Sequence, residues 1–269
     1  MKSVAISTIV AAARKEGSIV LFVPNVSKLR SSGKYVEPST THSKMFDVPL
    51  LSMSFLQQLY DAHGDQLEDL NLTIKKNIAL LPDDLQSGTL RDIVKTGKDS
   101  IEVANVAFIA TMSELMTQDN FAFYTIFDEY NSWFDSPLYY HMDYKGAETP
   151  IPHYLISAFQ PMLTMGFGKN NSSLMKKGGI IAAIDNTRPV KRSATVAACE
   201  QLRAEGALEV SVGRYSHTEF DHILSHYERV GIGKLRIYGA DVLENEEEIA
   251  FLRMLTGCIG SKLLNSIII

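Results

Sequence analysis

The sequence predicts an α/β fold built on a parallel sheet that is flanked by helices. Four apolar segments have the length of buried strands, and each is followed by polar residues: Ser18–Pro24, Phe121–Phe127, Gly179–Ile184 and Ala207–Val212. Segments with helical character alternate with these runs along the chain. Strands that alternate with helices are typical of a parallel sheet.

The composition excludes several classes of protein. The chain has 269 residues and is 45% hydrophobic, which is enough for a substantial core. No apolar run approaches the roughly 20 residues that span a bilayer, so no membrane partner is expected. A net charge of −5 argues against a protein that mainly grips nucleic acid. Two distant cysteines do not indicate a disulfide-stabilised secreted domain.

Helices are predicted on both sides of the first strand. Val4–Lys15 contains strong helix formers and is followed by Gly17, a residue that commonly ends helices. Leu50–His63 and Leu90–Met116 are expected to cover one face of the sheet. Asn25–Pro49 is rich in Ser, Thr, Lys and Gly, which predicts a long surface loop that serves a partner or ligand.

The pattern becomes helical near the C-terminus. His217–Val230 and Glu246–Met254 are the predicted helices. We therefore predict a core at residues 1–215 and a small C-terminal helical subdomain at residues 216–269.

The strongest functional signal is the run Phe121–Phe127, which ends in Asp128 and Glu129. Ligands of open α/β sheets bind at the carboxyl ends of the strands, where an acid commonly holds Mg²⁺ on a nucleotide. Asp128 is the candidate Mg²⁺ ligand, and Glu129 is the candidate catalytic base that activates water. The alternative is a strand-end acid that caps a loop.

The first residues provide a second signal. Lys2 and Ser3 precede a helix, as do the last two residues of the P-loop GxxxxGK[ST]. There the lysine reaches the terminal phosphates and the hydroxyl ligates Mg²⁺. On this interpretation the fold is P-loop NTPase-like (AAA-like), and the P-loop strand is missing upstream of Met1. The alternative is an ordinary solvated N-terminus.

A third group follows the run Gly179–Ile184. Asn186 and Thr187 are placed to sense a terminal phosphate, and basic residues come soon after them. A solvated basic turn is the alternative interpretation of those cations.

Several segments, in this order and spacing, resemble one known family, the mitochondrial small-subunit ribosomal proteins of the death-associated protein three family, which are P-loop NTPase relatives. The segments are KSVAISTIVAAARKEGSIVLFVPNV at Lys2–Val26, MFDVP at Met45–Pro49, TIFDEYNSWF at Thr125–Phe134, GGIIAAIDNTRP at Gly178–Pro189, LEVSVGRYSHTEFDHILSHYERVG at Leu208–Gly231 and LRMLTGCIGSKLLNSI at Leu252–Ile267.

The resemblance implies GTP/GDP or ATP with Mg²⁺ at the P-loop. It also implies a place in the head of the small ribosomal subunit, in the mitochondrial matrix, with ribosomal proteins and rRNA as partners. Lys2 and Ser3 fall on the Walker A lysine and hydroxyl, and Asp128 falls on the Walker B acid. The family pattern has glycine where this sequence has Met1.

Three functions remain open at this point. The favoured one is a structural ribosomal protein that binds a purine nucleotide as a folding ligand. The second is an active ATPase or GTPase that remodels a protein partner, with Glu129 as the base and one of Arg188, Arg192 or Arg214 acting on the terminal phosphate. The third is a nucleotide-free adaptor that binds proteins through Asn25–Pro49.

Overall fold

The structure is a computed structural model of the whole chain. It describes residues 2–32, 36–39, 42–74, 79, 81–135, 139–142, 148–152, 155–159, 162, 175–184, 192–204, 207–210, 215–230, 236–237, 240–241, 249–250, 253–254 and 258. The chain forms two compact units, one of residues 6–208 and one of residues 1–5 with 209–269. The predicted boundary between residues 215 and 216 stays a prediction.

The larger unit is built on a parallel three-stranded sheet. Its strands are β1 (Ile19–Val23), β4 (Phe123–Phe127) and β7 (Gly178–Ala182), in the order β1-β4-β7. The last residues of the three strands lie in register, since Val23 pairs with Phe127 and Phe127 with Ala182. The prediction of a parallel α/β sheet is thereby confirmed for three of the four proposed strands.

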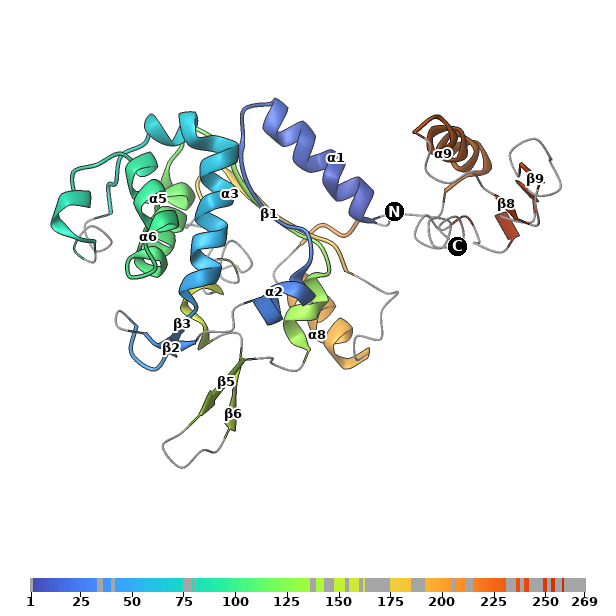
Figure 1. Ribbon diagram of the computed structural model, residues 1–269. Coiled ribbons are helices and arrows are strands. Elements are labelled where there is room, and N and C mark those ends of the chain that lie inside the picture. Colours follow the sequence, from blue (N-terminus) through green and yellow to red (C-terminus); the bar gives the residue numbers. More distant parts are fainter. Residues whose placement is uncertain are drawn as a thin grey trace. The chain divides into compact units, whose positions relative to one another are not determined.

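One face of the sheet is covered by α1 (Lys2–Lys15). Along this helix Ile6, Val10 and Ala13 are buried at helical spacing against β1 and β4, where they meet Val20 and Ile126. Figure 1 shows α1 running alongside the sheet.

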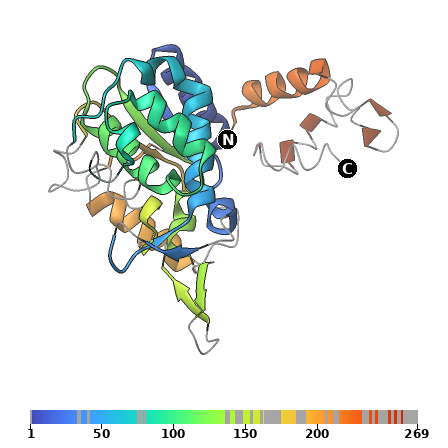
Figure 2. The same ribbon diagram turned by 60° about the vertical axis from the view of Figure 1, so that its left-hand side comes forward.

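The opposite face carries α3 (Pro49–Glu68), α5 (Leu90–Asp99) and α6 (Ala104–Thr117). These helices pack side by side as one layer, seen in Figure 2 in light blue and green. The prediction had one helix at 90–116, and the structure breaks it at residues 100–103, where Ser100 is extended. Helix α5 ends in Gly97-Lys98-Asp99, and Gly97 is so close to Ala107 that an added Cβ would lie 2.5 Å from the Ala107 Cβ.

Two local devices define helix ends in this unit. The N–H of Ser18 donates to the carbonyl of Ala13, and that of Gly17 to Arg14, which is a Schellman ending of α1. Gly17 supplies the left-handed φ of +79° that this ending requires.

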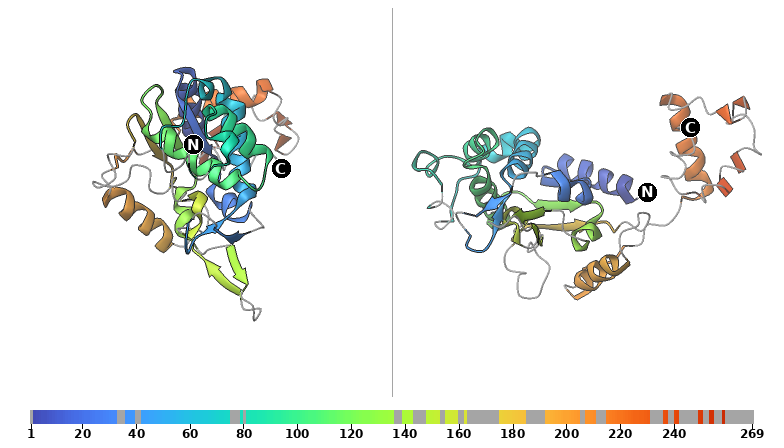
Figure 3. Two further views of the ribbon diagram at one scale, coloured as in Figure 1. Left: turned by 90° about the vertical axis from the view of Figure 1, so that its left-hand side faces the viewer. Right: turned by 60° about the horizontal axis from the view of Figure 1, so that its bottom comes forward.

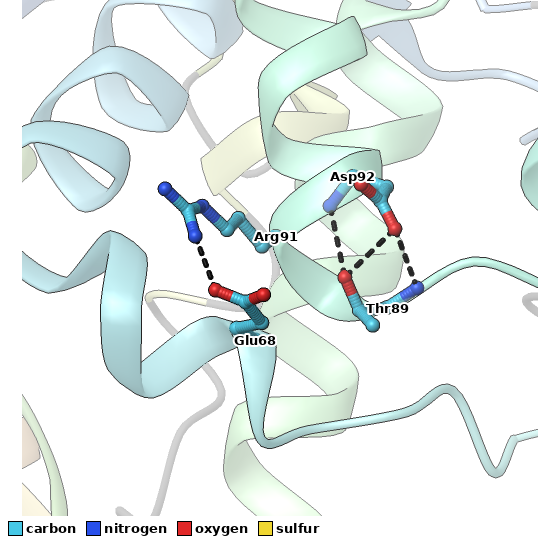
Figure 4. A network of polar contacts seen from close by, with 4 residues as sticks. All are labelled: Glu68, Thr89, Arg91 and Asp92. Carbon is cyan, nitrogen blue, oxygen red and sulfur yellow. Dashed lines mark hydrogen bonds and ion pairs between the residues drawn. The ribbon is translucent and has the colours of Figure 1, made fainter.

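At the start of α5, Thr89 and Asp92 form a reciprocal capping box, shown in Figure 4. The Thr89 hydroxyl accepts the N–H of Asp92, and the Asp92 carboxylate accepts the N–H of Thr89. The Thr89 hydroxyl also donates to Asp92 Oδ2 (2.8 Å), and this bond, together with that from the N–H of Thr89, lowers the pKa of the Asp92 carboxyl. Arg91 pairs with Glu68 of α3 in the same view.

The segment predicted as a long surface loop is partly folded. It contains α2 (Val26–Ser32) and a short antiparallel pair, β2 (Glu37–Pro38) with β3 (Phe46–Asp47). Val26 and Val48 are fully buried. The prediction of an exposed loop is therefore wrong at both ends of the segment, where apolar residues join the core.

A buried polar network attaches β3 to the helical layer. The Ser157 hydroxyl donates to Asp47 Oδ1 (2.5 Å), Asn105 Nδ2 donates to Ser157 Oγ (2.8 Å), and Ser52 Oγ donates to Asn105 Oδ1 (2.9 Å). All four residues are at most 5% exposed. Their mutual hydrogen bonds offset the cost of burying polar groups.

The remaining described elements of this unit are η1 (Asp83–Leu85), η2 (Tyr130–Phe134), β5 (Tyr139–Met142), β6 (Glu148–Ile151), η4 (Ser157–Phe159) and α8 (Arg192–Ala204). Strands β5 and β6 form an antiparallel hairpin that projects from the unit in Figure 1 and again in the left view of Figure 3. The hydroxyl of Tyr139 donates to the carbonyl of Leu29 and fixes the base of this hairpin.

The fourth predicted strand, Ala207–Val212, is not found where the structure describes it. Residues 207–210 have no strand conformation, and Leu208 and Val210 are 90% and 74% exposed. Residues 211 and 212 lie outside the described part. An alternating apolar pattern becomes a strand only if a neighbouring strand supplies hydrogen bonds, and no described strand pairs with residues 207–210.

The smaller unit contains α9 (His217–Val230), which confirms the predicted helix with the same bounds. It also contains a short antiparallel pair, β8 (Arg236–Ile237) with β9 (Ala240–Asp241), that the helical prediction missed. Arg253 pairs with Asp221 of α9. Of the predicted helix Glu246–Met254, residues 249–250 and 253–254 are helical and the others lie outside the described residues. Among the described helices none is long and apolar enough to span a membrane.

Candidate functional site

The candidate site lies at the carboxyl ends of β1 and β4. Asp128 and Glu129 directly follow β4, and Asn25 lies two residues beyond β1. Because Val23 and Phe127 are paired in register, the polar residues that follow them meet at one edge of the sheet. The sheet thus brings together side chains that are more than 100 positions apart.

Asp128 is 7% exposed and is held through its backbone on the β1 side. Its N–H donates to the carbonyl of Val23 (2.9 Å), and its carbonyl accepts the N–H of Val26 (3.2 Å). The carboxylate oxygen Oδ1 accepts the N–H of Glu129 (3.0 Å). Among the described residues, no hydrogen-bond partner is found for Oδ2. This oxygen is therefore available to an external ligand.

Glu129 has a left-handed backbone, with φ +60° and ψ +39°. This conformation is uncommon for a residue with a side chain and is typical of functional sites. The side chain is 8% exposed, and Oε1 accepts a hydrogen bond from Asn25 Nδ2 (3.3 Å). The candidate base is therefore held by a neutral amide.

Asn25 is itself oriented by helix α2. Its Oδ1 accepts the N–H of Lys28 and the hydroxyl of Ser27, both at 2.7 Å, so it caps the first turn of the helix. With the oxygen engaged by α2, the amide nitrogen has to face Glu129. Sequence reasoning missed this residue, although an Asn before a helical segment is a recognised N-cap signal.

The turn after Glu129 is tied to β7 and α8. The N–H of Tyr130 donates to the carbonyl of Ala183 (2.8 Å), and Asn131 Nδ2 donates to Thr195 Oγ1 (2.9 Å). Asn131 is fully buried. The ring of Trp133 packs edge-on against Phe127 below this turn. These contacts hold the two carboxylates in place.

The donor set fits Mg²⁺ that arrives with a nucleotide. No cluster of three or more His, Cys, Asp or Glu side chains that could enclose a metal occurs within the described ranges. Mg²⁺ does not require such a cluster, because it keeps several waters and is commonly bound by one or two carboxylates together with substrate phosphates. The available Oδ2 of Asp128 can supply one such bond.

Of the other predicted site residues, the structure describes Lys2, Ser3 and Arg192. Lys2 and Ser3 form the first turn of α1 and belong to the smaller unit, where Lys2 is half-buried and Ser3 exposed. Asn186 and Thr187 lie outside the described residues, as do Arg188, Lys191 and Arg214, and Arg192 is the first residue of α8.

Comparison with known proteins identifies one family. A family model described as mitochondrial ribosomal death-associated protein 3 matches residues 2–253, which is nearly the whole chain. The search of curated proteins gives no match.

Proposed function

This chain belongs to the mitochondrial ribosomal death-associated protein 3 family, and from that premise we propose that it binds a purine nucleotide as a structural ligand. Membership makes it a protein of the small subunit of the mitochondrial ribosome, located in the matrix. Ribosomal proteins and rRNA are accordingly its partners. GTP/GDP or ATP with Mg²⁺ is the proposed ligand.

The position and contacts of the Asp128 carboxylate support this proposal. The carboxylate is nearly buried at the carboxyl edge of the sheet, yet Oδ2 has no partner among the described residues. Carboxylate oxygens are the ligands that Mg²⁺ prefers, and it commonly takes one or two of them together with substrate phosphates. Mg²⁺ on a nucleotide would bind Oδ2 and neutralise the charge.

The proposal includes a P-loop NTPase-like completion of the sheet. A further parallel strand would pair with the side of β7 that faces away from β4, and Lys2 and Ser3 would contact the phosphates. Two observations support this. The residues of β7 are half-buried or exposed, whereas Phe123 and Phe127 of β4 are fully buried. The apolar side chains of Leu208 and Val210 are exposed to solvent.

We favour a nucleotide that is bound as a structural ligand over one that is hydrolysed, because of the hydrogen bond between Asn25 and Glu129. A general base has to be within reach of the water that it deprotonates. Here one oxygen of the candidate base accepts an amide hydrogen instead. Asn186 and Thr187 would contact the terminal phosphate in the same proposal.

The test is ligand-dependent stability. A nucleotide present at 100 times its dissociation constant stabilises a protein by about 2.7 kcal/mol. We expect Mg²⁺ with GTP or ATP to raise the unfolding midpoint of the full chain, and Asp128→Asn to abolish the rise. Asp119→Asn, at an exposed position before β4, is the matched control. A midpoint that no nucleotide shifts, combined with native protein from small subunits that releases none, would refute the proposal.

A further inference from the structure

The two outer strands of the sheet, β1 and β7, differ in what contacts the backbone groups on their outward-facing sides. In β1, the N–H of Ile19 donates to Ala122 of the neighbouring segment, and the carbonyl of Val23 accepts from Asp128. Residues 19, 21 and 23 therefore direct their backbone groups toward β4, because these directions alternate along a strand. The backbone groups of Val20 and Phe22 point away from β4, to the side where a further strand would pair.

That side of β1 is occupied by side chains of α3. Gln58 makes a pair of hydrogen bonds with Phe22, in which Oε1 accepts the N–H (3.0 Å) and Nε2 donates to the carbonyl (2.8 Å). A residue of a neighbouring strand would make the same two kinds of bond. The side-chain amide of Gln58 therefore makes the two hydrogen bonds to Phe22 that a neighbouring strand would make.

His63 bonds the outward-facing backbone of β1 two residues earlier, at Val20. Its Nε2 accepts the N–H of Val20 (3.0 Å), and both residues are buried. The ring orientation follows from Gln66, whose Nε2 donates to the carbonyl of Gly17 (2.7 Å). Gln66 Oε1 is thus left to accept from His63 Nδ1 (2.7 Å), so Nδ1 carries the hydrogen and Nε2 is a free acceptor.

The other edge has no equivalent in the part of the chain that the structure describes. Strand β7 is the last strand in the order β1-β4-β7. No hydrogen bond from a described side chain reaches the outward-facing backbone of Gly178, Ile180 or Ala182. Side chains therefore bond the outward-facing backbone of β1, whereas no described side chain does so on β7.

We propose that Gln58 and His63 seal a self-association surface on β1, which would otherwise pair with β1 of a second copy of the chain. The occupant follows from the sequence. Ser18–Val23, SIVLFV, carries no charge, and five of its six residues are apolar, three of them β-branched, which is the composition of segments that pair with identical segments when exposed. Pro24 and the charged Lys15 and Glu16 flank it, as gatekeeper residues do.

The experiment removes the seal in the full chain. We expect Gln58→Ala/His63→Ala to sediment as dimers and larger species at concentrations where the wild type sediments as a single smaller species. Gln57→Ala is the matched control, because Gln57 is on the same helix but is exposed and bonds only to Asp61. A double variant that stays folded and sediments as the wild type would overturn the proposal.

Hydrogen exchange of the wild type provides a second test that does not depend on the variants. The sealed amides of Val20 and Phe22 are expected to exchange at least 100-fold more slowly than the same amides in an unfolded chain. Exchange of these two amides at the unfolded-chain rate would contradict the seal. In the double variant the two β1 amides should exchange quickly at low concentration and become slow as the chain associates.

Discussion

Asn25 and Glu129, 104 positions apart, are joined by a hydrogen bond from Nδ2 to Oε1 of 3.3 Å. The same asparagine caps α2 through its Oδ1. One side chain therefore links the start of a helix to the candidate base. The two roles of Asn25 can be separated by substitution, because they use different atoms of its amide.

Asn25→Asp is expected to destabilise the protein by about 2 kcal/mol. Aspartate keeps the cap, since Asp and Asn cap helices equally well. It replaces the donor to Glu129 by a second carboxylate, and two like charges then face each other. Chemical unfolding of the two proteins measures the difference. Glu129→Gln added to Asn25→Asp should restore most of the loss, because the new amide can donate to the aspartate; a strictly additive double variant would contradict the contact.

His63 gives the protein a pH-dependent stability. Burial lowers the pKa of its imidazole, and the charge of Arg14 lowers it further, whereas the acceptors Gln66 Oε1 and the carbonyl of Val20 act in the opposite direction. In the unfolded chain the pKa is near the ordinary value of about 6.5. Below that pH the unfolded chain binds a proton that the folded protein refuses, so stability falls. Above it, the contribution of His63 is fully present.

Urea unfolding between pH 8 and pH 5 tests this. The free energy of unfolding of the wild type should decrease below pH 6.5, and His63→Gln should show a smaller decrease. His222→Gln, at an exposed position of α9, should retain the slope of the wild type. If His63→Gln loses stability at pH 5 as steeply as the wild type, the neutral imidazole is not the cause.

The position of Gly178 does not accommodate a side chain. Its φ is +118°, and an added Cβ would lie 1.8 Å from the carbonyl oxygen of Phe123. Gly178→Ala should cost more than about 3 kcal/mol, because the strained backbone and the collision both oppose the alanine. Gly179→Ala is the control, since its Cβ would meet nothing within 4 Å. Comparable unfolding midpoints for the two variants would show that β7 is not anchored here.

The capping box of α5 should contribute more than the neighbouring ion pair. Thr89→Ala removes the acceptor for the N–H of Asp92 and should cost about 1 kcal/mol. Glu68→Ala breaks a pair whose carboxylate side chain is 60% exposed, and it should cost less than about 0.5 kcal/mol. Thermal unfolding of both variants gives the order. A larger loss for Glu68→Ala would reverse our assignment.

The sequence predicted the elements whose signals are local. The apolar runs of β1, β4 and β7 and the terminator Gly17 are visible without knowledge of the fold. The split between α5 and α6 was missed, because Gly97 is needed for a contact with Ala107 that no local pattern reveals. Residues 207–210 alternate like a strand, but a strand also needs a neighbour.

The candidate site was predictable only in part for the same reason. Asp128 and Glu129 stand out because they end a buried run. The contact with Asn25 depends on the pairing of β1 with β4, which is a property of the sheet and not of either segment. The roles of Lys2, Ser3, Asn186 and Thr187 remain predictions.

The buried network that begins at Asp47 has a consequence for the order of folding. Asp47, Asn105 and Ser157 are each more than 50 positions from the next, so the network closes a large loop of chain. During synthesis the carboxylate of Asp47 emerges long before the hydroxyl that will satisfy it. We therefore expect the segment 45–49 to stay undocked on nascent chains that end before Ser157, so that the larger unit completes its folding in one late step and not strand by strand.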